Sequence, residues 1–218
     1  MITPTAEPAT SGRHALDGLR RAIAAGELRP GERVRQEEVA TALGVSVAPV
    51  REALATLEQE GQLTYRPRRG YFVAELDLAE LEEIYGLRRL LEDRAARAAL
   101  PALDAEAVER IAAAARECEE AAERGDVAAE LAANRRFHFG ILDGPGQAQT
   151  LRLIKLLWDS TEVYRAIYYN SPEARRSSLE AHERILTALR DRDADRLVAE
   201  LDAHRAEALA ALGAVLTR

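Results

Sequence analysis

Three of the four histidines in this chain stand where ligand chemistry is expected. His138, His182 and His204 each fall on the apolar stripe of a different predicted helix, and Asn134 precedes His138 by one helical turn. Imidazole nitrogens suit Zn²⁺, Ni²⁺ and similar ions, and three of them leave coordination positions open. The pattern predicts a metal or small-ligand site inside a helical core. The alternative is that each histidine is a core residue whose ring is satisfied by a backbone carbonyl.

Six long helices are predicted to position these side chains. Alanine, leucine, glutamate and arginine dominate the chain, which favours helix over sheet. Asp77 and Glu80 resemble a capping box, Pro101 closes the first helix, and Ser171-Pro172 supplies an N-cap and an N1 proline for the fifth. The expected helices span residues 78–99, 104–125, 127–142, 147–168, 172–190 and 194–216.

The residues ahead of these helices predict a different, smaller module. Helices are expected at about 14–25, 36–43 and 46–60, with a turn at Gly44 and an N-cap at Ser46. Residues 63–65 and 71–73 indicate a β-hairpin whose tip, residues 66–70, reads RPRRG. Two short helices joined by a glycine turn and followed by a basic hairpin describe a winged helix-turn-helix.

The predicted fold class is therefore mainly α, with an N-terminal winged helix-turn-helix followed by an all-α six-helix bundle. We expect a disordered Thr/Pro/Ala-rich tail over residues 1–12, a DNA-binding domain over 13–75, and a helical domain that holds the metal or small-ligand site over 76–218.

Composition excludes some classes of protein but not a DNA-binding one. The net charge is −7, yet residues 1–73 carry ten arginines and nine acidic residues, a local charge of about +1. Cys118 is the only cysteine, so no intrachain disulfide can form. No apolar run approaches the roughly 20 residues needed to span a bilayer, and the N-terminus does not resemble a signal peptide. We expect a cytoplasmic protein without membrane contact.

A winged helix-turn-helix reads DNA by placing its second helix in the major groove. Arg51 and the dipole of that helix would favour phosphate, and the hairpin arginines would lie along the backbone or in the minor groove. The alternative is that these arginines are solvated surface charges. The predicted DNA-contact residues are Arg35, Ser46, Pro49, Arg51, Arg68, Arg69 and Gly70.

Three sequence runs in this region resemble the N-terminal domain of GntR-type bacterial transcription regulators. They are AGELRPGERV at residues 25–34, LGVSVAPVREAL at residues 43–54, and RGYFV at residues 69–73. Val47 and Glu37 depart from the resemblance, because the family usually has arginine at both positions. We expect these departures to alter operator preference or weaken binding rather than abolish it.

The second domain resembles the FCD ligand-binding domain of one GntR branch, in its shorter, VanR-like version. The resemblance assigns His138, His182 and His204 to a divalent metal, which we expect to be Zn²⁺ or Ni²⁺, with Asn134 where the family usually has aspartate. Arg88, in YGLRRLLE at residues 85–92, matches an arginine that faces the family's pocket, so it is a candidate clamp for a small organic acid effector.

The resemblance implies a homodimeric transcription regulator, most often a repressor, that binds a palindromic double-stranded DNA operator. An enzyme is not expected, although a metal-dependent hydrolase is an alternative because three histidines around a metal can activate water. A regulator whose second domain is only structural is the other alternative.

Overall fold

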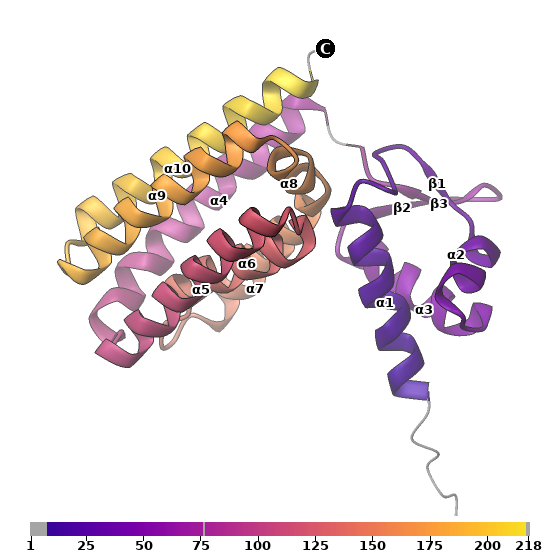
Figure 1. The fold of residues 1–218 in the computed structure, drawn as a ribbon, viewed down its shortest axis with the longest axis horizontal. Helices are drawn as coiled ribbons and strands as arrows, with labels where there is room; N and C mark the ends of the chain where they lie inside the picture. The colour runs from indigo at the N-terminus through magenta and orange to yellow at the C-terminus, as the bar shows by residue number, and fades with distance from the viewer. Residues whose placement is uncertain (1–7, 76, 217–218) are drawn as a thin grey trace, which may run out of the picture. The chain divides into compact units, whose positions relative to one another are not determined.

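The computed structural model describes residues 8–75 and 77–216. It shows a mainly helical chain with one small sheet, which confirms the predicted fold class (Figure 1). Internal packing divides the chain into two compact units. The first comprises the residues up to Glu75 together with Asp159–Val163, and the second comprises the remainder. No helix in the described part of the chain is long and apolar enough to cross a membrane.

The first unit is a winged helix-turn-helix. Its elements are α1 (Pro8–Ala24), β1 (Arg33–Val34), α2 (Gln36–Leu43), α3 (Val47–Gln59), β2 (Leu63–Arg66) and β3 (Gly70–Val73). The sheet has the order β1-β3-β2 with antiparallel pairs, and Leu63 faces Val73 across the hairpin. The hairpin, α2 and α3 lie where the sequence predicts them.

Three details of this unit differ from the prediction. Helix α1 begins at Pro8, so residues 8–12 are helical rather than part of a tail, and the rest of the expected tail, residues 1–7, lies outside the described residues. Strand β1 was not predicted, because a two-residue strand is defined by its pairing with β3 and not by a local pattern. Ser46 occupies the N-cap of α3, but its side chain makes no capping hydrogen bond.

The turn between α2 and α3 follows from one glycine. Gly44 is the C-cap of α2 in the left-handed region, at φ 66° and ψ 31°. Its backbone N–H bonds to the carbonyls of Ala40 and Thr41, which satisfies the end of the helix. Helix α1 packs against α3 around a small apolar core formed by Leu19, Ile23, Val50, Leu54 and Leu57.

The second unit is an all-α bundle, with its α-helices joined by short connections and one 3₁₀ turn. Its elements are α4 (Leu78–Ala99), η1 (Leu100–Ala102), α5 (Ala105–Arg124), α6 (Val127–Leu142), α7 (Ala148–Ser160), α8 (Glu162–Tyr169), α9 (Pro172–Arg190) and α10 (Ala194–Leu216), except that the end of α7 and the start of α8, within Asp159–Val163, group with the first unit.

Within residues 77–216 there are seven α-helices where six were predicted. The expected helix 147–168 is two helices, α7 and α8, which meet at Thr161. No proline or glycine marks the break, and the Thr161 side chain is fully buried. Tertiary packing around a buried residue therefore sets this break, and the local sequence gives no signal for it.

Aspartates cap the N-termini of three of these helices. Asp77 and Glu80 form the predicted capping box at α4, with the Glu80 backbone N–H donating to Asp77 Oδ1 at 2.8 Å. Asp104 accepts from the Ala107 N–H at α5, and Asp126 accepts from the Ala129 N–H at α6. These caps fix the starting residues, and hence which side chains of each helix face the core.

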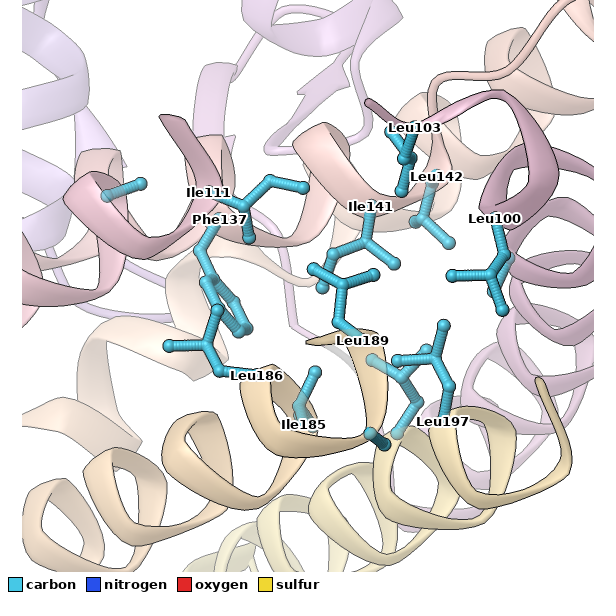
Figure 2. Packing of buried hydrophobic residues seen from close by; sticks show 14 of the residues in the cluster. Leu100, Leu103, Ile111, Phe137, Ile141, Leu142, Ile185, Leu186, Leu189 and Leu197 are labelled. Atoms are coloured by element: carbon cyan, nitrogen blue, oxygen red, sulfur yellow. The ribbon is translucent and has the colours of Figure 1, made fainter. Parts of the chain in front are cut away.

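Helix α10 packs against α4 and α9, and α5 packs against α6 and α9. The core between them is aliphatic apart from Phe137 and Trp158, and Figure 2 shows its leucines and isoleucines meeting from α5, α6, α9 and α10. His138, His182 and His204 occupy turns of α6, α9 and α10 that also supply this core, which explains why polar rings stand on apolar stripes.

Candidate metal centre and nucleic-acid interface

The three predicted histidines converge in the interior of the bundle. His138 on α6, His182 on α9 and His204 on α10 are all buried, and each offers a ligand nitrogen within 4.8 Å of the others. Their ring centroids are 5.2 to 5.5 Å apart, and the rings of His138 and His204 are stacked. Phe137 packs against His182 with ring centroids 4.1 Å apart, which restrains that imidazole. The histidine cluster is thus held by the aliphatic core.

Asn134 belongs to the same cluster. It lies one turn before His138 on α6 and is 2% exposed, and its Oδ1 is 3.1 Å from His182 Nε2. Two ligand atoms that each lie about 2.1 Å from one ion and are adjacent in its coordination shell are separated by about 3 Å. In this structure Asn134 Oδ1 and His182 Nε2 are joined by a hydrogen bond, and the same spacing is compatible with that geometry.

The chemistry of the donor set also fits a metal. Burial lowers the pKa of all three imidazoles, to about 4 for His204, where Arg88 and Arg205 lower it further. Neutral imidazole is the form that binds metals. The Nδ1 atom of each ring is buried without a hydrogen-bond partner among the described residues, which is costly for a polar group in a core. An ion coordinated by these nitrogens would relieve that cost. Hydrogen bonds from these nitrogens to a bound ligand would have the same effect.

A network of buried charges lies beside the histidine cluster. Glu92 on α4 is 1% exposed and accepts hydrogen bonds from Arg88 Nε at 2.8 Å, Trp158 Nε1 at 2.7 Å and Arg205 at 2.9 Å. Arg205 Nη2 also donates to Asp93 at 2.6 Å. Because the Arg88 and Arg205 guanidiniums pair with Glu92, its pKa is lowered despite the opposing effect of burial.

Trp158 joins this network to the histidines. The guanidinium of Arg88 lies 4.4 Å from the centre of the indole, and that of Arg165 lies 4.3 Å from it. The His138 ring is 5.1 Å from the same indole. These contacts place two cations near the metal candidate residues.

A small cavity of about 30 Å³ adjoins both groups. Its lining includes Arg88, Arg165, Arg205, His138 and His204, together with Asn134 and the aromatic side chains of α4, α7 and α8. No carboxylate lines it within the described part of the chain. Arg88 Nη1 and Arg205 Nε are buried donors without hydrogen-bond partners there. The cavity is electropositive and presents unused hydrogen-bond donors, a combination suited to an anion.

Glu130 is a second buried carboxylate, one turn before Asn134 on α6. Both of its oxygens lack hydrogen bonds among the described residues, and Arg175 Nε lies 3.4 Å from Oε2. Burial raises the pKa of Glu130 to about 7, against the lowering effect of Arg175. It does not line the cavity, so it is separate from the metal candidate set.

The predicted DNA-contact residues are spread over α2, α3 and the hairpin. Arg51 and Ser46 are exposed on α3, and Pro49 lies in its first turn. Arg35 precedes α2 and pairs with Glu38 at 2.7 Å, which reduces its availability to phosphate. Within the described part of the chain, Arg51 forms no ion pair. The charge of Arg51 is therefore available to a DNA phosphate at the surface of α3, the second helix of the helix-turn-helix.

The hairpin tip is shaped by two residues with positive φ. Arg68 has φ 62° and Gly70 has φ 92°, which is the backbone of a tight turn. The guanidiniums of Arg66 and Arg69 lie 4.4 and 5.6 Å from the Phe72 ring centre, whereas Arg68 and Arg69 are exposed at the tip. The turn thus presents arginines at the end of a short two-stranded ribbon.

Comparison with known proteins matches both units. Residues 12–73 match the bacterial regulatory proteins of the gntR family, and residues 83–207 match the FCD domain. The chain belongs to the GntR family, in its FCD branch. This confirms the resemblance in both parts of the sequence. Members of this family are DNA-binding transcription regulators, and so is this protein.

Relatives and solved structures agree with this assignment. The chain is 36% identical over 179 residues to the Nta operon transcriptional regulator of Aminobacter aminovorans, covering 81% of this chain and 82% of that protein. It is 35% identical over 81 residues to the HTH-type transcriptional repressor RspR of Escherichia coli strain K12, covering 37% of this chain and 36% of that one. The structure of E. coli McbR/YncC superposes with a TM-score of 0.79 at 25% identity, covering 97% of this chain and 98% of that chain.

Sequence reasoning missed several residues of this GntR-family site. Glu92 follows Arg88 by one turn, on the same stripe as Leu81, Tyr85 and Ala95, so two charged residues interrupt an apolar face. Arg205 likewise continues the stripe of Leu197 and Leu201 on α10. For both Glu92 and Arg205, a charged residue at a helix position expected to be buried was the sequence signal that could have identified it. Arg165 carried no such signal, because its position depends on the unpredicted start of α8.

Proposed function

We propose that this regulator senses a divalent metal together with a small carboxylate and changes its affinity for DNA in response. The observation that carries the proposal is the buried cluster of His138, His182, His204 and Asn134 beside an arginine-lined cavity. We assign DNA binding to residues 13–75, and metal binding, effector binding and dimerisation to residues 76–218. Because it acts on DNA in a bacterium, we place the protein in the cytoplasm.

The metal is Zn²⁺ or Ni²⁺ in this proposal, held by the three imidazoles with the Asn134 oxygen as a fourth donor. Nitrogen-rich sets of this kind suit both ions. A bound ion would supply a fixed positive charge with open coordination positions. The protein's own contribution is to keep the imidazoles neutral by burial and to fix their orientation by packing against Phe137 and Trp158.

The effector is a small organic acid in this proposal. Arg88 is the clamp predicted from the sequence, and the structure adds Arg165 and Arg205 beside it. A cavity of about 30 Å³ holds about two water molecules, so an organic acid requires the pocket to widen. A ligand that binds the widened state better shifts the protein toward it. Helix α4, which carries Arg88, begins at Leu78, soon after β3 ends at Val73, so it directly continues the chain of the wing.

The DNA interface in this proposal comprises the residues predicted from the sequence: Arg35, Ser46, Pro49, Arg51, Arg68, Arg69 and Gly70. The exposure of Arg51 on α3 and of Arg68 and Arg69 at the hairpin tip supports it. We propose that a homodimer reads a palindromic operator with half-sites about one helical turn apart. Leu87 and Leu90 on α4 and Leu153 and Leu156 on α7 are exposed, and a partner subunit would cover such side chains.

We propose repression as the direction of control, because one relative is named as a transcriptional repressor. Hydrolysis is less well supported than regulation. A hydrolase needs a general base near the metal, and Glu92, the buried carboxylate beside the cluster, is engaged by Arg88, Trp158 and Arg205. A purely structural role for the second domain would leave three buried imidazole nitrogens without hydrogen-bond partners among residues 8–75 and 77–216.

The test is metal binding by the full chain, purified without an affinity tag and stripped with a chelator. We expect one Zn²⁺ or Ni²⁺ per chain by calorimetry, and a loss of affinity of at least about 100-fold in His138→Ala. His14→Ala is the matched control, because His14 is exposed on α1 in the other unit. On an operator selected from random duplexes, metal with an organic acid should change the affinity of the wild type but not of His138→Ala. Equal metal binding by the two variants would contradict the proposal.

A further inference from the structure

The first turn of α3 presents uncharged side chains at the end of the helix that meets base edges in a helix-turn-helix. Ser46, Val47 and Ala48 precede Pro49 at this end. Ser46 and Ala48 are exposed, Val47 is half-buried, and the Ser46 side chain makes no capping hydrogen bond. The turn therefore offers one hydroxyl and the methyl groups of a valine and an alanine to a base.

The helix-turn-helix has few cations that could replace these side chains at a base. Residues 35–59 contain two arginines and four glutamates, so this segment carries a net charge of −2. Arg35 is paired with Glu38 at 2.7 Å. Arg51 follows Val47 by one helical turn on the same side of α3. The segment as a whole attracts phosphate weakly, so its contribution to operator recognition has to come from contacts with bases.

The acidic side chains of α3 are directed or placed away from this turn. Glu52 Oε2 lies 3.7 Å from the point that a Cβ at Gly12 of α1 would occupy, so the carboxylate extends toward α1. Glu58 stands eleven residues after Val47, about 16 Å further along the helix. A carboxylate reads cytosine by accepting a hydrogen bond from its amino group. The first turn of α3 lacks such an acceptor and is left to apolar and hydroxyl contacts.

Apolar side chains distinguish thymine from the other bases in the major groove. Thymine carries a 5-methyl group there, whereas guanine, adenine and cytosine present hydrogen-bonding groups without a methyl. Guanine is commonly read by the paired donors of arginine or by lysine, and adenine by the amide of asparagine or glutamine. None of these four residue types occurs at residues 45–50. The turn therefore has the groups that select thymine and lacks those that select guanine or adenine.

We propose that the first turn of α3 reads thymine methyl groups in the operator, and that Val47 is the residue that sets this preference. The inference rests on the DNA interface of the proposed function and deepens it, because it names the base that α3 recognises. Each half-site then contains an A·T pair whose thymine methyl packs against Val47. Burial of one methyl group corresponds to about a fourfold change in affinity.

Replacement of thymine by uracil tests the proposal, because the two bases differ only in the 5-methyl group. An operator is selected from random duplexes with the full wild-type chain, and each thymine of one half-site is then replaced singly by deoxyuridine. Fluorescence anisotropy measures the affinity. We expect replacement at the position that faces Val47 to weaken binding by about fourfold.

Two failures of this experiment are distinguishable. If no replacement weakens binding but Arg51→Ala does, methyl recognition is overturned and the DNA interface stands. If Arg51→Ala and every replacement leave the affinity unchanged, the assignment of α3 to the DNA interface fails as well.

Val47→Ala removes the two γ-methyl groups from the turn and should reduce the penalty for uracil at the sensitive position to less than about twofold. Val108→Ala is the matched control, because Val108 is a half-buried valine in the first turn of α5 in the other unit. It should keep the full penalty. Circular dichroism confirms that both variants are folded. Equal uracil penalties in Val47→Ala and Val108→Ala would contradict the proposal.

Val47→Arg provides a second route, because it places paired donors in the same turn. Operators selected with this variant should carry guanine at the position where operators of the wild type carry the sensitive thymine. Selection of the same base at that position by Val47→Arg and the wild type would show that Val47 does not set the preference.

Discussion

The two units of this protein place their charged residues in opposite ways. In the winged helix-turn-helix, Arg51, Arg68 and Arg69 are at the surface. In the helical bundle, Arg88 and Arg205 are buried against Glu92, next to three buried histidines. Exposed charges cost little to hold and attract a large polyanion from solution, whereas buried charges are expensive unless they are paired. The first arrangement suits a DNA surface, and the second suits selection of a small ligand.

Breaking the buried network should have the largest effect. Glu92→Gln removes the carboxylate that pairs with both Arg88 and Arg205, and we expect it to lower the free energy of unfolding by about 3–5 kcal/mol. Glu82→Gln, at an exposed position on the same helix, is the control. Urea unfolding followed by circular dichroism measures both. A loss below about 1 kcal/mol in Glu92→Gln would mean that the network contributes little to folding.

The buried histidines should make the metal-free protein sensitive to acid. The pKa of His204 in the folded state, about 4, is below its ordinary value near 6.5, so the unfolded chain binds more protons between these pH values. The stability from His204 is complete above pH 6.5 and is lost as the pH falls toward 4, by about 3 kcal/mol in total. The free energy of unfolding should therefore fall as the pH is lowered from 6.5 to 4. His204→Gln should make this fall smaller, whereas His14→Gln should leave it unchanged. Identical slopes in all three proteins would show that burial does not perturb His204.

The exposed cations can be tested on a selected operator. Arg51→Ala should weaken operator binding by about tenfold or more, because it removes a cation from the helix expected to enter the major groove. Arg110→Ala, which removes an exposed arginine from α5 in the other unit, should leave the affinity unchanged. Fluorescence anisotropy with labelled duplex measures both. If Arg51→Ala binds as well as the control, Arg51 is a solvated surface charge.

The smallest effect is expected at the wing. Arg68→Asn removes one charge but keeps a residue type that tolerates the left-handed backbone at this position. We expect the slope of the logarithm of affinity against the logarithm of salt concentration to become shallower by about 0.9, the effect of one lost phosphate contact. Sequence preference should not change. An unaltered slope would place Arg68 away from the DNA backbone.

The same contrast explains what could be predicted from the sequence. The winged helix-turn-helix is defined by local signals such as Gly44 and the RPRRG tip, so α2, α3 and the hairpin were found where they lie. In the bundle, Asp77 and Ser171 marked helix starts. The positions of the three histidines on apolar stripes indicated buried rings, and the resemblance to the FCD domain assigned them to one site; their ligand nitrogens lie within 4.8 Å of one another.

The features that were not predicted from the sequence depend on packing between segments that are distant along the chain. The break at Thr161 has no proline or glycine, and the contribution of Arg165 follows from that break. The pairing of Glu92 with Arg205 joins residues 113 positions apart. The i, i+3 and i, i+4 spacings within one helix carry no information on partners in another helix. A charged residue on an apolar stripe does indicate that a partner exists, but not which residue it is.

Trp158 gives the protein an internal optical reporter. It is the only tryptophan in the chain, the guanidiniums of Arg88 and Arg165 lie 4.4 and 4.3 Å from the centre of its indole, and the His138 ring is 5.1 Å away. Indole emission depends on nearby charges and on contact with water, so any ligand that rearranges these neighbours would alter its wavelength and intensity. The fluorescence of the unlabelled protein would therefore follow occupancy of the bundle interior without interference from tryptophan elsewhere in the chain.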